Sequence, residues 1–269
     1  MTEASDIGGV EKFAPKGFFL SHRGKVREAN EDSILCDKIY SKDDCSESLA
    51  FDFSDKNQWV IALADGMGGA AAGEVASRKT VQTLQTCRDC TSTGIAEALC
   101  GINQELYQAV ADDEKLRGMG STVSGICHGP DGYVAFNVGD SRIYRQQDQF
   151  LSQISKDDTA EQILIDAGKS DPGGIRGKGL NQLTQALGGG GEYRDIEPNI
   201  FPITIKRQSR LLLCSDGLTD MVDLDALEAI MSQEKDNNIA INKLFDAAMQ
   251  KGGRDNISII ILELCDLSK

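Results

Sequence analysis

The hydrophobic positions of the chain follow two kinds of pattern. Short apolar runs bounded by turn residues predict strands at residues 33–39, 58–64, 121–128, 133–138, 195–205, 209–214 and 257–264. Apolar residues repeating every three or four positions predict helices at residues 70–87, 95–110, 161–167, 181–187, 224–231 and 238–250. Strands come in neighbouring pairs and helices come in pairs between them. This order favours antiparallel sheets covered by helices over a doubly wound parallel sheet.

Two stretches interrupt the pattern. Residues 41–56 are polar and form a hairpin insertion or a loop. Residues 169–179 are Gly-rich and follow a predicted helix, so we expect this stretch to form a flap beside a site. The Gly-rich runs at 66–69 and 188–191 lack the spacing of a dinucleotide fingerprint or a Walker loop, which argues against those two nucleotide sites.

Acidic residues stand at the ends of the predicted strands. Asp65-Gly66 and Asp216-Gly217 each close an apolar run. A carboxylate there must be paired or hydrogen-bonded, because a bare charge in a low-dielectric setting costs several kcal/mol. The remaining acids at such places are Glu31, Asp32, Asp140 and Asp255. Carboxylates that are far apart in sequence and meet at strand ends predict a metal site.

The donor types select a hard cation. The chain has only two histidines, His22 and His128, so the oxygen donors favour magnesium or manganese over zinc. Several carboxylates around one point would repel unless two cations lay between them, roughly 3.5 to 4 Å apart, and such a pair activates a bridging water. Gly66 lets its carbonyl approach an ion, and Arg27 can grip a phosphate, although a surface salt bridge is the alternative for Arg27.

Composition narrows the class of protein. A chain of 269 residues can bury a full core as one domain. The 28 Lys and Arg against 42 Asp and Glu give a net charge of −14, which argues against binding to nucleic acid or to an anionic membrane. With no export signal and no apolar run long enough to span a membrane, we expect a cytoplasmic protein.

The eight cysteines do not predict disulfides. Those at 100, 127, 214 and 265 fit buried apolar positions of helices or strands. Cys87 and Cys90 have C-x-x-C spacing at the end of a helix, without a second pair at zinc-finger spacing. A structural role is favoured for them over a redox or zinc role.

Six short motifs around the acids follow one order along the chain. They are Arg27-Glu28-Ala29-Asn30-Glu31-Asp32, Ala64-Asp65-Gly66-Met67-Gly68-Gly69, Gly118-Met119-Gly120-Ser121-Thr122, Val138-Gly139-Asp140-Ser141-Arg142, Ser215-Asp216-Gly217-Leu218-Thr219-Asp220 and Gly253-Arg254-Asp255-Asn256. This set resembles that of the protein phosphatase 2C (PPM) family in its bacterial form, over residues 17–264. The resemblance implies the α+β class, as a four-layer αββα sandwich of two central antiparallel sheets flanked by helix pairs. It also implies a single domain over 1–269 with its core at 17–264.

The resemblance implies a centre of two Mn²⁺ or Mg²⁺ ions with a weaker third site. Asp65 would bridge both ions. The Gly66 carbonyl and a water-linked Glu31 or Asp32 would serve one ion, and Asp216 with Asp255 the other. The weaker site would use Asp140 with Asp216, while Arg27 would bind phosphate and residues 161–178 would form the flap. Two departures from the family are Met67, where many members have His, and Asp157-Asp158-Thr159, where Asp-His-Ser is common.

The function expected from this resemblance is a metal-dependent protein serine/threonine phosphatase. A metal-bridging hydroxide attacks phosphorus in line, with Arg27, Asp65 and Asp216 as the catalytic residues. Its partners would be phosphoproteins, the substrates of a Ser/Thr kinase, and the protein would be a monomer. One alternative is a phosphoprotein-binding pseudophosphatase, although no metal acid is missing. The other is a phosphodiesterase or nuclease, where the charge leaves only small nucleotides as substrates.

Overall fold

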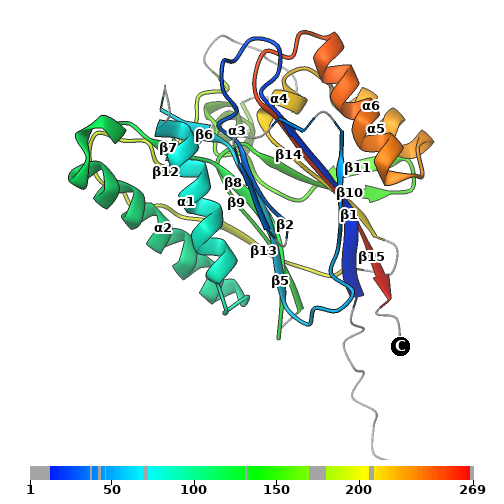
Figure 1. The fold of residues 1–269 in the computed structure, drawn as a ribbon, viewed down its shortest axis with the longest axis horizontal. Helices are drawn as coiled ribbons and strands as arrows, with labels where there is room; N and C mark the ends of the chain where they lie inside the picture. The colour runs from blue at the N-terminus through cyan, green and yellow to red at the C-terminus, as the bar shows by residue number, and fades with distance from the viewer. Residues whose placement is uncertain are drawn as a thin grey trace, which may run out of the picture.

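Two antiparallel sheets of six strands each form the centre of the protein. The computed structural model describes residues 13–36, 38–41, 44–45, 47–68, 72–130, 132–169, 180–205 and 209–266. The sheets lie face to face, and a pair of helices covers the outer side of each (Figure 1). The predicted α+β class and αββα layering are therefore confirmed.

The first sheet contains both ends of the described chain. Its strand order is β11 (Phe150–Gln153), β10 (Arg142–Gln147), β14 (Arg210–Cys214), β15 (Ile257–Asp266), β1 (Phe13–His22) and β4 (Leu49–Asp52). Strands β1 and β15 pair along their whole length, from Phe13 opposite Asp266 to His22 opposite Ile257. This ladder fixes the register of the segments that lead to Arg27 and Asp255.

The second sheet contains most of the remaining strands. Its order is β13 (Asn199–Ile203), β9 (Gly132–Val138), β8 (Val123–Gly129), β5 (Trp59–Ala64), β2 (Ser33–Cys36) and β3 (Lys38–Ser41). A small third sheet joins β12 (Leu187–Gly188), β7 (Gly120–Ser121) and β6 (Gly66–Met67). Because β6 directly follows Asp65, the small sheet lies beside the predicted site.

The helices divide between the two outer faces. Helices α1 (Ala72–Thr86) and α2 (Ser92–Asp112) pack on the second sheet, and α5 (Leu224–Gln233) and α6 (Asn237–Gln250) pack on the first. Side chains cap three of these helices: Thr91 accepts a hydrogen bond from Gly94 N, Asp223 from Ala226 N, and Asp236 from Asn238 N. Short helices α3 (Ala160–Asp166) and α4 (Asp216–Thr219), with the 3₁₀ turn Glu114–Leu116, complete the set.

Strand alternation explains how the apolar runs are buried on both faces. In β5, Trp59, Ile61 and Leu63 enter the core between the sheets, while Ala62 and Ala64 face the α1–α2 pair. Strand β15 likewise divides its apolar side chains between the central core and the α5–α6 layer. Continuous apolar sequence is therefore what a strand buried on both faces requires.

Some predicted elements need correction. The strand expected at 33–39 is two strands, β2 and β3, and β4 lies inside the stretch 41–56 and pairs with β1. The helix expected at 181–187 is wrong, because this segment makes an isolated bridge from Leu183 to Thr159 and ends in β12. Strands β1, β10 and β11 were not expected, since their apolar residues are mixed with polar ones. Residues 170–178 of the predicted flap lie outside the described residues.

Two glycines give a matched test of the packing. A Cβ on Gly17 in β1 would lie 2.0 Å from the Ile261 carbonyl oxygen, whereas a Cβ on Gly101 in α2 meets nothing within 4 Å. We expect Gly17→Ala to lower the free energy of unfolding by about 1–3 kcal/mol. Gly101→Ala should raise it by up to about 1 kcal/mol. Urea denaturation measures both, and equal effects of the two variants would contradict the packing described for β1.

Candidate functional site

The predicted acids meet at one end of the two central sheets. Asp65 directly follows β5, and Asp140 and Asp216 are each the second residue after the end of their strand, β9 and β14. Asp255 lies just before β15, and the Glu31–Asp32 pair lies just before β2. Because neighbouring strands are antiparallel, these strand ends and strand starts fall at the same edge.

A cleft of about 540 Å³ opens at this edge. Of the eight residues predicted for the site, seven line the cleft: Arg27, Glu31, Asp65, Gly66, Asp140, Asp216 and Asp255. Asp32 is the exception, because its side chain is fully buried beside them. The structure therefore brings the predicted acids together, with Asp32 behind the surface of the cleft.

Both Asp-Gly pairs have a packing reason for their glycine. A Cβ on Gly66 would lie 2.2 Å from the Gly73 carbonyl oxygen, and a Cβ on Gly217 would lie 1.9 Å from the Asn256 carbonyl oxygen. Backbone segments thus approach too closely for any side chain at either position. The glycines let the segments that carry Asp65 and Asp216 pack tightly against their neighbours.

Asn256 holds the Arg27–Asp32 segment in place. Its Oδ1 accepts a hydrogen bond from Glu31 N at 2.8 Å, and its Nδ2 donates to the carbonyls of Ala29 at 2.9 Å and Arg23 at 3.1 Å. The side chain is 4% exposed, so its hydrogen bonds are sheltered from water. Asn256 is the last residue of the sixth motif, and the sequence predicted no role for it.

Four aspartates at the site have a raised pKa, namely Asp32, Asp65, Asp140 and Asp216. Burial is the largest cause in each case, and the charges of neighbouring acids add to it. The pKa rises to about 7 for Asp32, to about 8 for Asp140 and to about 6 for Asp216. The pKa of Asp65 also lies well above its ordinary value, because burial is reinforced by the charges of four other aspartates, which are Asp32, Asp216, Asp140 and Asp255. Asp65 is therefore the centre of the cluster.

Arg27 is the cation in contact with this cluster. Its Nη2 donates a hydrogen bond to Asp255 Oδ2 at 2.5 Å, and this bond is the main cause that raises the pKa of Arg27. The side chain is 54% exposed, so it remains accessible from the cleft. The salt bridge considered for Arg27 thus exists, and its partner is a cleft acid.

The donor set fits a divalent hard cation. Asp32 Oδ1 and Asp216 Oδ1 are buried and have no hydrogen-bond partner among the described residues, which is costly unless a proton or a cation satisfies them. Within the described ranges, no three His, Cys, Asp or Glu side chains already form a ready ligand set. Instead Asp65 and Asp216 lie close enough to shift each other's pKa, and Arg27 holds Asp255. A cation would displace these pairings, as carboxylate ligands bind metal in their deprotonated form.

Asp158 connects the Asp140 turn to the segment after the flap. It accepts hydrogen bonds from Gly139 N at 2.8 Å, Gln185 Nε2 at 3.1 Å and Asn199 Nδ2 at 3.0 Å. All three partners donate hydrogen bonds, so this position needs a side chain that can accept several of them. The Asp158 carboxylate does so, which accounts for Asp at the place where Asp-His-Ser has His. The neighbouring Asp157 is bound by Arg142 through both Nε and Nη2.

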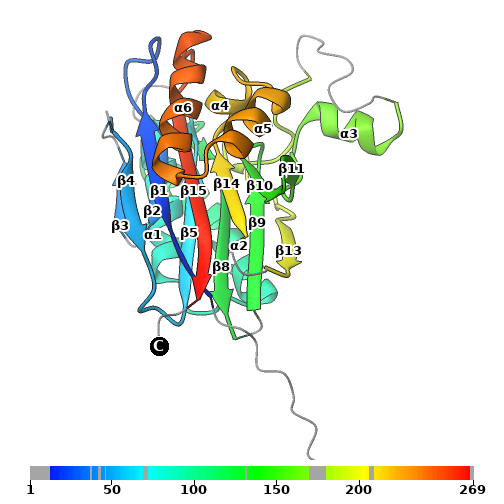
Figure 2. The ribbon, with the colours of Figure 1, turned by 90° about the vertical axis from the view of Figure 1, so that its right-hand side faces the viewer.

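The flap region, with Met67 and His22, remains to be placed relative to the cleft. Helix α3 stands off the body of the sandwich (Figure 2), and beyond it Asn181 and Leu183 line the cleft. Sequence reasoning missed both residues because it placed them in a helix. Met67 also lines the cleft, whereas His22 accepts a hydrogen bond from Gly24 N and packs on Phe245.

Comparison with known proteins matches this arrangement. A family model described as Protein phosphatase 2C covers residues 37–239. The chain belongs to the protein phosphatase 2C family. The resemblance predicted from the six motifs is thereby confirmed. In the described part of this protein phosphatase 2C chain, no helix is long and apolar enough to cross a membrane.

Two curated relatives illustrate the similarity of this protein phosphatase 2C chain. It is 32% identical to serine/threonine protein phosphatase PstP of Mycobacterium tuberculosis, over 91% of this chain and 44% of the relative. It is 30% identical to serine/threonine phosphatase stp of Listeria monocytogenes, over 91% of this chain and 94% of that protein. The chain thus spans less than half of the mycobacterial relative and nearly all of the Listeria one.

Solved structures agree with these relatives. A crystal structure of M. tuberculosis PstP superposes with a TM-score of 0.77 at 29% identity, covering 93% of this chain and 99% of that one. The PstP catalytic domain in complex with two manganese ions gives a TM-score of 0.75 at 29% identity, covering 94% and 100%. The predicted enzyme class agrees with the names of these proteins.

The raised pKa values predict how stability depends on pH without metal. Asp32 and Asp140 keep protons in the folded state up to about pH 7 and about pH 8, whereas an unfolded Asp loses its proton near about pH 4. The folded state therefore binds more protons in this interval, so the free energy of unfolding falls as the pH rises. Urea denaturation in EDTA at several values between about pH 5 and pH 8 measures this slope.

Asp32→Asn provides the matched variant for this measurement. It removes one of the titrating groups and keeps the shape of the side chain, so the slope should become shallower. Asp246→Asn, an exposed change of the same charge on α6, should leave the slope unchanged. A wild-type stability that stays level or increases between those pH values would contradict the electrostatics described here.

Proposed function

We propose that the protein is a metal-dependent protein serine/threonine phosphatase. The observation that carries this proposal is the convergence of Asp65, Asp140, Asp216 and Asp255 with Arg27 on one cleft. Family membership and the names of the relatives support it. The proposal takes the chain as one domain over 1–269 that acts in the cytoplasm as a monomer.

The cleft acids would hold two divalent ions, Mn²⁺ or Mg²⁺. The related PstP catalytic domain contains two manganese ions. We assign Asp65 to both ions, Gly66 and Glu31 or Asp32 to one, and Asp216 with Asp255 to the other. The central place of Asp65 supports this assignment, since the four neighbouring aspartates of the site all act on its pKa. Asp140 would contribute to a third, weaker site.

The chain's own groups would bind and orient the phosphoryl group. Bound divalent ions supply Lewis acidity and a water activated for in-line attack on phosphorus. Arg27 would turn from Asp255 and donate two parallel hydrogen bonds to phosphate oxygens, which is the geometry that guanidinium favours. Met67 has no acid–base group, so the proton for the leaving alcohol comes from elsewhere.

The substrate would be a phosphorylated Ser or Thr in a protein, placed there by a Ser/Thr kinase. Asn181 and Leu183 line the cleft opposite the strand ends and would contact the peptide beside the phosphate. The net charge of −14 disfavours nucleic acid. A phosphoprotein-binding module without turnover and a phosphodiesterase for small nucleotides are the alternatives that activity assays separate.

Metal-dependent turnover is the first expected outcome. Purified protein with Mn²⁺ or Mg²⁺ should release phosphate from a phosphothreonine peptide, and EDTA should stop the release. A cyclic nucleotide supplied under the same conditions should stay intact. Binding of the phosphopeptide without release of phosphate would instead favour the pseudophosphatase alternative.

The variant Asp216→Asn tests the role of the cleft acids. We expect it to lower metal-dependent turnover by more than about 100-fold, equivalent to about 2.7 kcal/mol in the barrier. The exposed variant Asp246→Asn carries the same charge change and should keep wild-type turnover. Full activity of Asp216→Asn would overturn the proposed mechanism.

A further inference from the structure

A second chemical feature lies at the other end of strand β5. Asp65 follows the last residue of β5, whereas Cys127 on β8 pairs with Val60 near its start. Cys90, in the connection between α1 and α2, packs against Cys127 there. The two thiols are therefore separate from the acidic cleft.

The two cysteine residues are in direct contact. Cys127 Sγ donates a hydrogen bond to the Cys90 carbonyl oxygen at 3.7 Å, and both side chains belong to one buried cluster. Cys90 is packed so tightly that a Cβ on Gly129 would lie 2.8 Å from its Cβ. Cys87, which shares the C-x-x-C spacing, donates instead to the Asp89 carbonyl at 3.3 Å. The spatial partner of Cys90 is thus Cys127.

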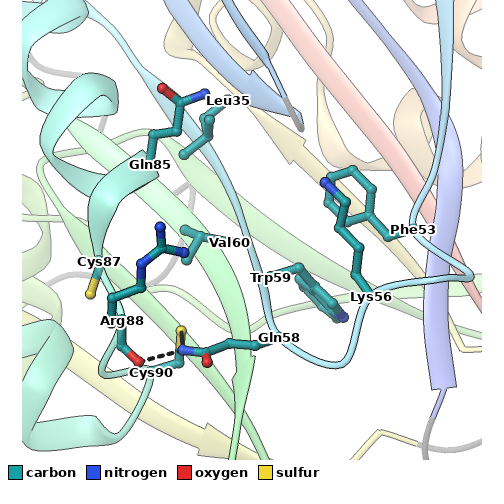
Figure 3. Close-up of a pocket in the computed structure, with 10 residues that line it drawn as sticks. All are labelled: Leu35, Phe53, Lys56, Gln58, Trp59, Val60, Gln85, Cys87, Arg88 and Cys90. Carbon is teal, nitrogen blue, oxygen red and sulfur yellow. Dashed lines mark hydrogen bonds between the residues drawn. The ribbon is translucent and has the colours of Figure 1, made fainter.

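The surroundings favour a thiolate on Cys90. Gln58 Nε2 donates a hydrogen bond to Cys90 Sγ at 3.2 Å and another to the Arg88 carbonyl at 2.5 Å (Figure 3). The neighbouring Cys127 is the largest cause that lowers the pKa of Cys90, to about 7, and the pKa of Cys127 is raised. One sulfur can therefore act as a nucleophile while its neighbour stays a thiol.

A cavity of about 160 Å³ gives access to Cys90. Cys90 and Gln58 line it together with Arg88, and Figure 3 shows these residues around the space. Although Cys90 is only 1% exposed, the cavity could hold several molecules of the size of water, each of which occupies about 30 Å³ in the liquid. Hydrogen peroxide is small enough to enter. Cys127 does not line the cavity, so Cys90 would react first.

We propose that Cys90 and Cys127 form a modification site that a peroxide converts to a reversible disulfide. The Cys90 thiolate attacks one peroxide oxygen, the O–O bond breaks, and the departing hydroxide takes a proton to become water. Cys127 Sγ then attacks the sulfur of the Cys90 sulfenic acid, an S–S bond forms, and the hydroxide leaves with the Cys127 proton as a second water. The two thiols lose two electrons, which reduce the peroxide to water.

Tryptic mapping after peroxide treatment tests the pair, because cleavage sites separate the three cysteines. Cys87 falls in peptide 80–88, Cys90 in 89–115 and Cys127 in 118–142. Folded protein treated with hydrogen peroxide and then alkylated should yield 89–115 linked to 118–142, and dithiothreitol should separate them. The expected bond removes two hydrogens from the intact mass. The experiment is run in EDTA, so its result does not depend on phosphatase activity.

Variants assign the bond to its sulfur atoms. Peptide 89–115 also contains Cys100, so Cys100→Ser should leave the linked product unchanged, while Cys90→Ser and Cys127→Ser should each abolish it. The wild-type map stands even where a serine variant fails to fold. A disulfide that links peptide 80–88 to peptide 89–115 would overturn the proposal. So would a Cys90 that remains a free thiol under peroxide treatment strong enough to oxidise Cys100.

Discussion

The site depends on one constraint: the fold places several acidic side chains close together at one cleft. Asp32, Asp65, Asp140 and Asp216 all have a raised pKa, because burial and mutual repulsion oppose ionisation. Arg27 neutralises only Asp255 directly. Such a cluster is tolerated when its members carry protons or share cations, and each isolated ionised carboxylate would otherwise cost several kcal/mol. The electrostatics of the fold thus favour the binding of divalent cations.

The sandwich supplies the rigidity that keeps these acids together. Each acid lies next to the end or the start of a strand that is hydrogen-bonded to its neighbours in the sheet, and the β1–β15 ladder fixes both segments that meet at Asn256. Close backbone contacts at Gly66 and Gly217 allow no side chain there. The repulsion between the carboxylates is therefore opposed by main-chain packing, which distributes the cost over two sheets.

Much of the fold could be predicted from the apolar runs of the strands, the acidic residues at their ends and the helical spacing of apolar residues. The apolar runs of β5, β14 and β15 are continuous because both faces are buried, and Asp65 and Asp216 stand out after them. Strand β1 was not predicted, because its apolar residues are interrupted by Pro15, Lys16 and Gly17.

Contacts between distant parts of the chain determine the features that the local sequence did not predict. Residues 181–187 have helical spacing, yet Leu183 bridges Thr159 and Thr184 N bonds to the Asp158 carbonyl. The supporting roles of Asn256 and Asp158 depend on partners from distant parts of the chain. The pairing of Cys90 with Cys127 in place of Cys87 has the same origin, since β8 approaches the α1–α2 connection only in the folded protein.

The occupancy of the acidic cleft by metal is the point on which the proposed chemistry depends. Anomalous diffraction from crystals grown with manganese at about pH 7.5 would measure it directly, since most of the acids can be deprotonated by metal near that pH. We predict two Mn²⁺ ions in the cleft, about 3.5 to 4 Å apart, both bound by Asp65. Ordered crystals that show no manganese in the cleft, with Arg27 still bonded to Asp255, would contradict a binuclear centre.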